Sequence, residues 1–390
     1  MNYRFFLSFN LLVFVFVFSL NAQKLQLPKL SKDAFFSLIT CTPGNEVYNQ
    51  FGHSAIRLKD DKLGLDFVYN YGTFNYETPN FILKFIERKL MYTLSKSSFK
   101  PFLNSFVQEG RGVAEQKISL DSVQRQKLFE ILEINYLPQN REYLYDFFYD
   151  NCASKIRDVI ATTGKLKIDE TKSKKTFRHF LDEYTSHDPW LNFGIDLILG
   201  LEADKICNKE LQMFLPDYLS SNLENASLNN EKLMENTVWI LPKPAKKSIK
   251  QTFTPFFLSC SLLCLSLLLF FTKKLRILAV YEIILLSCFF LAGLFLMFMW
   301  FGTDHIATQK NLNILWANPL YILWIISAYR KKISKFAQYN AYMLLASNAI
   351  VLFMYVIPIQ EFNYAVLPLL LISTLALCRI LFINKLENEL

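Results

Sequence analysis

The chain changes character abruptly at residue 253. From there to the C-terminus, long apolar segments alternate with short polar loops, at 253–271, 277–301, 314–329, 341–359 and 364–382. An α-helix needs about 17–25 mainly apolar residues to cross the hydrocarbon core of a bilayer, and only a helix or a closed barrel satisfies its backbone polar groups there. The sequence therefore predicts an all-α domain of five transmembrane helices over residues 251–390.

The residues before this domain have a mixed, more polar composition. Residues 1–22 carry one arginine, then an apolar run, then small and polar residues before Gln23, which is the pattern of a secretory signal peptide. The alternative is an uncleaved anchor helix, but the apolar run is short for a membrane span. We therefore predict a signal peptide over 1–22 and an exported α+β domain over 23–250.

The loops between the apolar segments predict the orientation in the membrane. Loops 273–276 and 330–335 are rich in Lys and Arg, whereas loops 302–313 and 360–363 are nearly free of them. Because basic loops stay in the cytoplasm, the exported domain is expected outside the inner membrane and the C-terminus in the cytoplasm. The net charge of +8 then indicates membrane contact, since the chain has no nucleic-acid-binding motif.

Three of the seven cysteines, Cys41, Cys152 and Cys207, lie in the exported domain. An odd number leaves at least one thiol unpaired, and the sequence leaves open a Cys41–Cys207 disulfide. No pair of cysteines has the spacing of metal ligands, and four histidines are scattered over the chain. The sequence therefore predicts neither a metal nor a cofactor.

Cys152 is the candidate nucleophile. It follows Asp150 and Asn151, either of which is a good N-cap, and it begins a segment with apolar residues at helical spacing, Ile156, Val159 and Ile160. Unpaired backbone N–H groups and the positive end of a helix favour a thiolate, and they also stabilise a developing oxyanion. The alternative for this single cysteine is a structural role.

The candidate base is His53. Residues 50–58 and 65–74 alternate as two strands around a polar hairpin over 59–64, and His53 lies in the first of them. A histidine within reach of the thiol would take its proton. The alternative is a histidine of the core or the surface.

The third member of a catalytic triad depends on the hairpin register. If Leu58 pairs with Leu65, His53 lies opposite Asn70, and opposed residues point to the same face of a sheet. Asn70 would then orient the imidazole in a Cys-His-Asn arrangement. A slip of two residues would offer other partners, Asp66 or Gly72.

Several motifs together resemble a known family. The stretches "FFSLITCTPGNEVYNQFGHSAIRL", "VYNYGTFNYETPNFILKFIERKLMYTL", "EGRGVAEQ", "YLYDFFYDNCASKIRD" and "TDHIATQKNLNILWANPL" are similar to the Lnb N-terminal periplasmic domain family of Bacteroidota. The order of histidine before cysteine also resembles circularly permuted papain-like enzymes such as lecithin–retinol acyltransferase. The resemblance thus implies a permuted papain-like (NlpC-type) periplasmic domain followed by a five-helix transmembrane domain.

The resemblance also implies an activity, lipoprotein N-acylation. An acyl chain would move from a phospholipid to a thioester on Cys152, and then to the N-terminal amine of a diacylglyceryl-cysteine lipoprotein. The expected partners are therefore a phospholipid donor, a lipoprotein acceptor and the inner membrane.

Five further residues are candidates for substrate binding. Tyr48, Tyr149 and Asn151 lie near the histidine and cysteine in sequence, and Asp304 and His305 lie in a predicted outer loop. For each of them the alternative is an ordinary structural role.

Two other functions fit the same residues. The triad could belong to a papain-like cysteine hydrolase of cell-envelope peptides, amides or lipids. The exported domain could instead be a non-enzymatic sensor of the envelope, which would retain its function without the Cys152 thiol.

Overall fold

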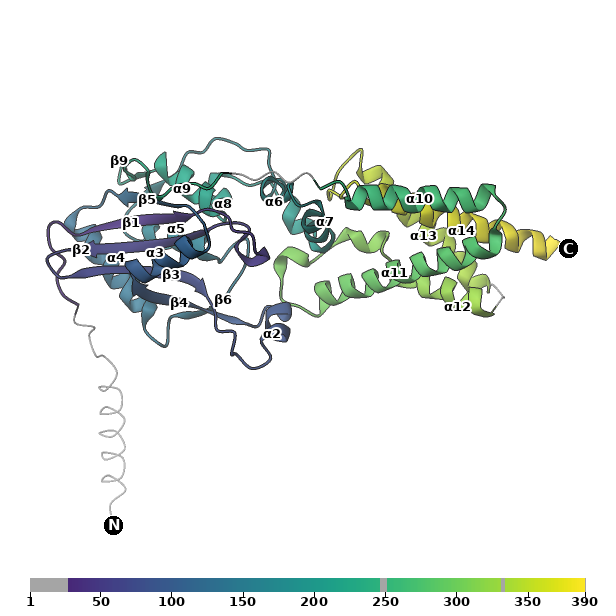
Figure 1. Cartoon of the computed structure of the whole chain (residues 1–390), viewed down its shortest axis with the longest axis horizontal. Coiled ribbons are helices and arrows are strands. Elements are labelled where there is room, and N and C mark those ends of the chain that lie inside the picture. The colour runs from purple at the N-terminus through teal and green to yellow at the C-terminus, as the bar shows by residue number, and fades with distance from the viewer. Residues whose placement is uncertain (1–26, 246–250, 331–333, 390) are drawn as a thin grey trace, which may run out of the picture.

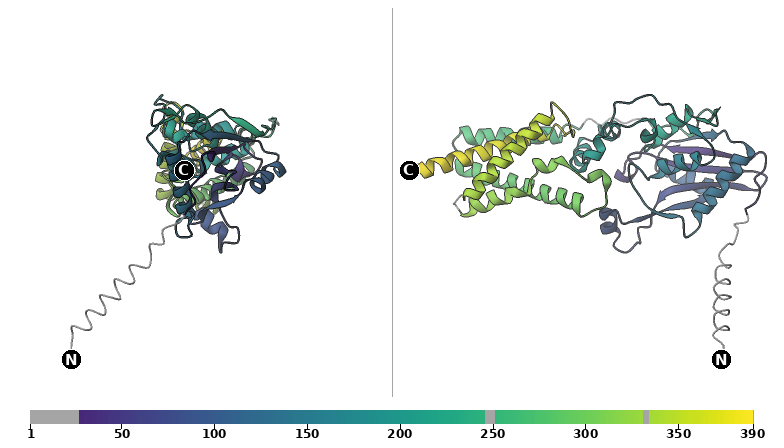
Figure 2. Two further views of the ribbon diagram at one scale, coloured as in Figure 1. Left: turned by 90° about the vertical axis from the view of Figure 1, so that its left-hand side faces the viewer. Right: turned by 180° about the vertical axis from the view of Figure 1, so that it is seen from behind.

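The computed structural model describes residues 27–245, 251–330 and 334–389, so the predicted signal peptide over 1–22 lies outside the described residues. A sheet-rich part precedes a helical part, and the two follow one another along the long axis of the molecule (Figures 1 and 2). The sheet-rich N-terminal domain and the helical C-terminal part agree with the predicted α+β and all-α division.

An antiparallel sheet forms the centre of the first part. Its strand order is β10-β5-β1-β2-β3-β4-β6. The strands are β1 (Phe35–Cys41), β2 (His53–Asp60), β3 (Leu65–Thr73), β4 (Met91–Ser98), β5 (Val113–Ile118), β6 (Glu142–Leu144) and β10 (Val238–Leu241). A small second sheet contains β7 (Leu166–Lys167), β8 (Ser227–Leu228) and β9 (Glu231–Lys232).

Helices cover both faces of the central sheet, because alternate residues of its middle strands are apolar on either side. Leu38 and Ile56 pack with α4 (Ser122–Tyr136), α5 (Cys152–Ala161) and α9 (Pro216–Glu224). On the other face, Ile39 and Ala55 pack with α3 (Phe99–Gln108). The remaining short elements are η1 (Val47–Asn49), α2 (Phe81–Glu87), α6 (Phe177–Thr185), α7 (Pro189–Ile198), η2 (Leu201–Asp204) and α8 (Lys209–Gln212).

The register of the β2–β3 hairpin differs from the predicted one. Asp60 pairs with Leu65, so Leu58 lies opposite Phe67 instead of Leu65. The turn is tighter than expected because the Asp60 side chain accepts hydrogen bonds from the backbone N–H groups of two turn residues, Lys62 (3.1 Å) and Leu63 (3.3 Å). A slip of two residues keeps every side chain on its face of the sheet, since strands have a period of two.

The helical part contains α10 (Pro255–Phe271), α11 (Leu275–Phe301), α12 (Ile322–Arg330), α13 (Lys335–Met354) and α14 (Val366–Glu389). Among the described helices, α11 is the one with at least 18 residues and the hydropathy of a membrane span, and α10 and the segment 366–382 are shorter apolar helices. That all five helices cross the membrane stays a prediction.

The third predicted span, 314–329, is not one continuous helix. Two 3₁₀ turns, η4 (Leu312–Leu315) and η5 (Pro319–Tyr321), come before α12. Pro319 has no backbone N–H and cannot continue a preceding helix, and the Asn318 side chain caps the new turn by accepting a hydrogen bond from the Leu320 N–H. The apolar periodicity of the segment did not reveal this break.

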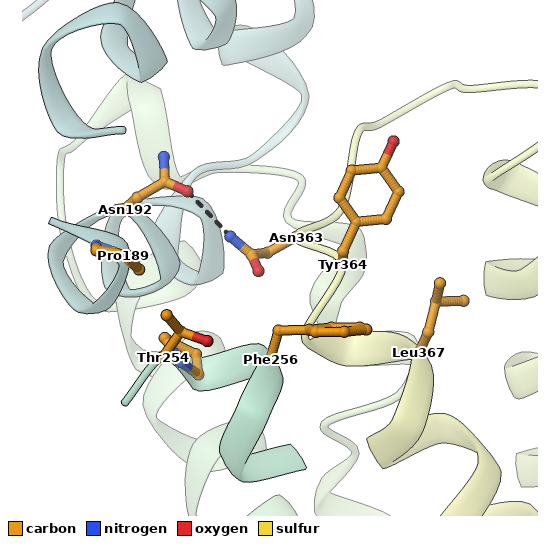
Figure 3. Close-up of a pocket in the computed structure, with 8 residues that line it drawn as sticks. Pro189, Asn192, Thr254, Phe256, Asn363, Tyr364 and Leu367 are labelled. Carbon is orange, nitrogen blue, oxygen red and sulfur yellow. Dashed lines mark hydrogen bonds between the residues drawn. The ribbon is translucent and has the colours of Figure 1, made fainter. Parts of the chain in front are cut away.

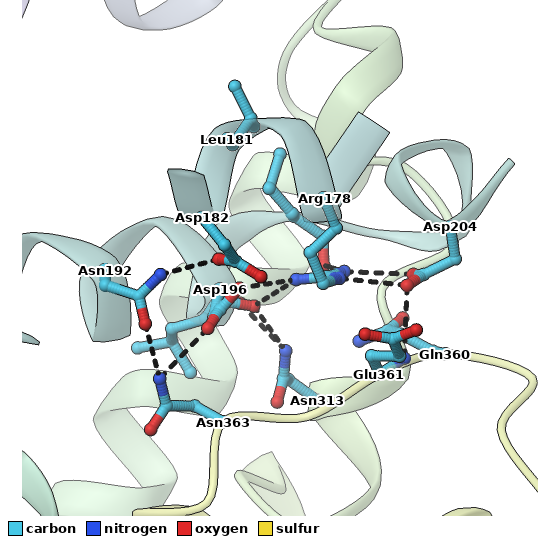
Figure 4. Close-up of polar contacts among 12 residues, drawn as sticks. Arg178, Leu181, Asp182, Asn192, Asp196, Asp204, Asn313, Gln360, Glu361 and Asn363 are labelled. Carbon is cyan, nitrogen blue, oxygen red and sulfur yellow. Dashed lines mark hydrogen bonds and ion pairs between the residues drawn. The ribbon is translucent and has the colours of Figure 1, made fainter. Parts of the chain in front are cut away.

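The two parts meet through a buried ionic cluster (Figure 4). Arg178 of α6 is 2% exposed and forms ion pairs with Asp196 of α7 (3.0 Å) and Asp204 of η2 (2.9 Å). The loop between α13 and α14 binds the same carboxylates, because Asn363 Nδ2 donates to Asp196 Oδ2 (3.0 Å) and the Glu361 N–H donates to Asp204 Oδ1 (3.2 Å). The loops at this end of the helices are the ones predicted to lie outside.

The loop after α11, which includes η3 (Ile306–Thr308), forms a second contact between the parts. The Gly200 N–H donates to the Ala307 carbonyl (2.8 Å), and a Cβ atom at Gly200 would lie 1.8 Å from the Gln309 carbonyl oxygen. Only glycine therefore permits this close approach, and the two parts pack backbone against backbone here.

Candidate functional site

The thiol of Cys152 lies at the N-terminus of α5, as the sequence predicted for this helix. Asn151 is the N-cap, and its Oδ1 accepts hydrogen bonds from the backbone N–H groups of Ala153 (2.8 Å) and Ser154 (2.9 Å). The N–H of Cys152 itself has no hydrogen-bond partner among the described residues. This N–H is free to donate to an oxyanion that forms on a group bonded to the sulfur.

His53 and Asn70 complete the arrangement. His53 lies beside Cys152, near enough that each side chain shifts the pKa of the other. The ring contacts Asn70, whose Oδ1 lies 2.6 Å from His53 Nε2. The paired residues of β2 and β3 end at Ile56 opposite Tyr69, and Asn70 contacts His53 just beyond this pair. The structure thus brings the three predicted residues together, although the predicted register was wrong.

Electrostatics at this site favour a thiolate–imidazolium pair. Burial by itself raises the pKa of the Cys152 thiol, but the His53 charge, its hydrogen bond and the N–H groups of Ser54 and Ala153 outweigh burial and leave the pKa lowered. For His53, burial lowers the pKa, but the Cys152 thiolate and the bonds to Cys152 and Asn70 outweigh it and leave the pKa raised. A thiolate is the nucleophilic form of cysteine.

The other two cysteines of this domain, Cys41 and Cys207, have raised pKa values. Burial raises the pKa of Cys41, which lies in the core beneath α3, and raises that of Cys207 to about 12. All seven cysteines are free thiols, so the Cys41–Cys207 disulfide that the sequence left open is absent. Cys152 is therefore the one thiol of the described N-terminal residues with a lowered pKa.

A pH profile of alkylation tests this assignment. Because its pKa is lowered, Cys152 keeps its thiolate as the pH falls and loses it only below the lowered value. Iodoacetamide should therefore modify Cys152 faster than an ordinary thiol at a pH below about 8.5, the usual pKa of cysteine. Peptide mass spectrometry would follow Cys152, with Cys41 and Cys207 as unreactive internal controls. In His53→Gln the profile of Cys152 should move to higher pH, and an unchanged profile would contradict the pairing.

Two tyrosines beside the thiol were not predicted. Gly72 has a φ of +88°, and a Cβ atom there would lie 3.4 Å from Tyr145 Cε2, 3.6 Å from Cys152 Cβ and 3.9 Å from the Tyr143 hydroxyl. The Tyr143 hydroxyl is buried and has no hydrogen-bond partner among the described residues. Both tyrosines belong to the aromatic run before Cys152, but only the packing of β6 beside β4 places them near it.

The three predicted substrate residues near the thiol, Asn151, Tyr149 and Tyr48, differ in their contacts. Every polar atom of the Asn151 side chain is used, since Nδ2 donates to the carbonyls of Phe147 (2.7 Å) and Phe214 (2.8 Å). The Tyr149 hydroxyl bonds Glu202. Tyr48 is 68% exposed on η1, with no side-chain hydrogen bond to a described residue. Asn151 is therefore the cap of α5, and its predicted contact with substrate stays a prediction.

The predicted residues of the outer loop contact α2. The Asp304 N–H donates to the Glu87 carbonyl (3.1 Å), and His305 Nε2 lies 3.3 Å from the Phe85 carbonyl oxygen. Burial lowers the pKa of His305, so its neutral ring donates to this carbonyl. Among the described residues, neither Asp304 nor His305 forms a hydrogen bond or an ion pair with Cys152 or His53, and both join the outer loop to the α2 segment.

A pocket of about 530 Å³ lies apart from these residues, between the starts of α7, α10 and α14 (Figure 3). Its walls are mainly apolar, and its two amides, Asn192 and Asn363, bond each other (3.1 Å). The lining contains no cysteine, histidine or carboxylate. This pocket therefore lacks the groups that the thiol site supplies for chemistry.

Comparison with known families agrees with the two-part layout. The model of the Lnb N-terminal periplasmic domain matches residues 28–183, and that of the Lnb transmembrane domain matches residues 246–387. The chain belongs to the Lnb family. Searches of curated proteins and of solved structures give no match. This Lnb-family protein is thus a membrane protein with a periplasmic N-terminal domain, and the thiol site lies in that domain.

Proposed function

We propose that this Lnb-family protein is a thiol acyltransferase that N-acylates lipoproteins at the periplasmic face of the inner membrane. The observation that carries the proposal is the Cys152 thiol at a helix N-terminus, with its pKa lowered by His53, whose ring contacts Asn70. Membership of the Lnb family supports lipoprotein modification as the task. The antiparallel sheet, with histidine on a strand before the cysteine helix, accords with a permuted papain-like domain.

The first half-reaction transfers an acyl chain from the phospholipid to Cys152. The Cys152 thiolate attacks the carbonyl carbon of a phospholipid ester, and a C–S bond forms as the carbonyl oxygen becomes an oxyanion beside the Cys152 N–H. The intermediate collapses, the ester C–O bond breaks, and the His53 imidazolium gives its proton to the leaving alkoxide. A lysophospholipid departs, and an acyl thioester remains on Cys152.

The second half-reaction transfers the acyl chain from Cys152 to the lipoprotein. The neutral α-amine of a diacylglyceryl-cysteine lipoprotein attacks the thioester carbonyl, and His53, now neutral, takes a proton from the nitrogen. The C–S bond breaks, the thiolate is restored beside the imidazolium, and the product is an amide on a triacylated lipoprotein. Atoms and charges balance without a metal or a cofactor.

The placement of the domain supports lipid substrates. Arg178, Gly200 and the outer loops hold the periplasmic domain directly against the helices, so the thiol is tethered to the membrane that contains both substrates. Holding reactants in one place converts a bimolecular step into an effectively unimolecular one. We infer that the five C-terminal helices all span the inner membrane, with the C-terminus in the cytoplasm.

An acyl trap tests the proposal. The full-length protein in detergent is mixed with phospholipid without an amine acceptor, and its intact mass is compared with that of Cys152→Ala. A fatty-acyl adduct is expected on the wild type alone, and neutral hydroxylamine should release it. Adding a diacylglyceryl-cysteine lipopeptide should then move the acyl group to the peptide amine.

Other outcomes would favour the alternatives. Release of free fatty acid without transfer to the lipopeptide would indicate a lipid hydrolase. Absence of any adduct, while Cys152 still reacts with iodoacetamide, would refute the acyltransferase. A cysteine hydrolase of peptides or an envelope sensor would then be the better description.

A further inference from the structure

Helix α2 exposes an apolar face in the periplasmic domain. Ile82 is 72% exposed, Leu83 52% and Phe85 51%, and Tyr76 in the preceding loop is 66% exposed. No residue of α2 is buried. Contiguous exposed apolar side chains are uncommon on a surface that meets only water, and they mark contact with a protein or a membrane.

The C-terminal end of α2 is fastened to the chain where α11 ends. α11 ends at Phe301, and Asp304 and His305 bond the carbonyls of Glu87 and Phe85. Arg88 Nη1 also donates to the Asp304 carbonyl (2.9 Å). Figure 1 shows α2 at the end of the sheet-rich part that faces the helices. The exposed face therefore lies at the level where an apolar span leaves the bilayer.

An unbroken series of aromatic contacts runs from α2 toward the thiol. Ring centroids are 6.3 Å apart for Phe85 and Phe81, and 5.7 Å apart for Phe81 and Phe74. The series continues through Phe74 and Tyr92 (5.2 Å) to Tyr92 and Tyr145 (4.5 Å). These five residues, which we call the aromatic series, offer apolar contact along the whole distance.

The end of the aromatic series reaches the reactive residue. Tyr145 and Cys152 both lie within 3.6 Å of the position that a side chain at Gly72 would occupy. Arg88 holds this end in place, because its Nε donates to the Tyr145 carbonyl (2.8 Å) and its Nη2 pairs with Asp146 (3.1 Å). The same arginine therefore ties the outer loop, α2 and the segment before Cys152 together.

The charges around α2 suit an anionic surface. Lys84 lies within the helix and Lys89 just after it. Lys89 pairs with Glu87 (2.9 Å), the one acidic residue of α2, so the polar side keeps a net positive charge. Amphipathic helices with basic residues on the polar side lie in the headgroup region of membranes, with their apolar side chains in the acyl boundary. Phospholipid of the outer leaflet thus matches both the apolar face and the charges.

We propose that α2 and Tyr76 insert into the outer leaflet of the inner membrane, and that the acyl donor passes along the aromatic series to Cys152. The donor path rests on the proposed function, because that function supplies the reaction at Cys152. The membrane contact of α2 does not depend on it. The covering partner is phospholipid; a second copy of the chain is the competing occupant that the experiment excludes.

Photocrosslinking tests the contact without any chemistry at the thiol. p-Benzoylphenylalanine is placed at Leu83 in full-length Cys152→Ala protein, reconstituted into vesicles of phosphatidylethanolamine and phosphatidylglycerol. The control places it at Val123 on α4, which is 74% exposed. A phospholipid adduct is expected at Leu83 and not at Val123. No lipid adduct at Leu83, or a crosslink to a second copy instead, would overturn the proposal.

A kinetic comparison tests the path of the donor. Ile82→Asp with Leu83→Asp should lower the rate of thioester formation from vesicle phospholipid by about tenfold or more, since apolar contact with the membrane is lost. The rate with a water-soluble p-nitrophenyl ester should stay unchanged, and Val123→Asp should change neither rate. Equal rates with vesicle donor in all variants would overturn the proposed path.

The two proposals fail in different ways. If no donor acylates the wild type but Leu83 crosslinks to lipid, the proposed reaction is wrong and the membrane contact stands. If the wild type forms the thioester but Leu83 gives no lipid adduct, the reaction stands and the role of α2 is wrong. If the α2 variants react more slowly with both donors to the same extent, α2 supports the fold of the site and the proposed donor path is wrong.

Discussion

Replacing His53 with glutamine is expected to lower the rate of thioester formation on Cys152 by about 10²–10⁴-fold. The variant loses both the positive charge that lowers the pKa of Cys152 and the proton that the leaving lysophospholipid needs. Intact-mass kinetics with phospholipid would measure the effect. Asn70→Ala should cause a smaller loss, because Asn70 only orients the ring through its contact with Nε2.

A matched histidine serves as the control for this prediction. His187 lies between α6 and α7, and its Nε2 is 3.2 Å from Gln50 Nε2. His187→Gln makes the same chemical change away from the thiol and should leave the rate near that of the wild type. Equal rates of thioester formation for His53→Gln and His187→Gln would mean that Cys152 reacts without His53, and the proposed mechanism would be wrong.

Replacing Arg178 with alanine is expected to destabilise the protein by about 3–5 kcal/mol, because it leaves buried carboxylates without a cation. The side chains of Arg178, Asp196 and Asp204 are 2%, 9% and 8% exposed (Figure 4). The carboxylates also accept hydrogen bonds from the 360–363 loop, so the contact between the two parts should loosen as well. Thermal unfolding in detergent, followed by tryptophan fluorescence, would measure the change.

An exposed ion pair of the same region is the control. Lys175 pairs with Glu183 of α6 at 2.5 Å, but their side chains are 56% and 36% exposed. Exposed pairs contribute little to stability, so Lys175→Ala should leave the unfolding temperature almost unchanged. Similar unfolding temperatures for Arg178→Ala and the wild type would show that the ionic cluster does not hold the two parts together.

The candidate triad could be predicted because each member has a local pattern. Asn151 and the apolar residues after it define the start of α5, and alternation defines the strands that carry His53 and Asn70. The prediction of Asn70 was right despite the incorrect register, because a shift of two residues keeps Asn70 on the same face of the sheet, within contact of His53. A slip of one residue would have placed it on the other face.

Contacts between segments that are far apart in the sequence could not be predicted from local patterns. The aromatic run before Cys152 is visible in the sequence, but Tyr145 reaches the thiol only through the pairing of β6 with β4. Likewise, Asp304 and His305 looked like substrate contacts because they are polar residues of an outer loop. They bond the α2 segment, more than 200 positions earlier in the chain, and their predicted contact with substrate stays a prediction.

By itself, the sequence determined the two-part layout, the apolar helices and the three residues of the candidate triad. Hydrophobic periodicity and helix caps involve residues that are close together in the sequence, so both can be recognised from the sequence alone. The tertiary structure alone decided the hairpin register, the break before α12, the Arg178 cluster and the position of α2 beside the outer end of α11. Each of these depends on which distant polar groups pair once water is excluded, and no local pattern encodes that choice.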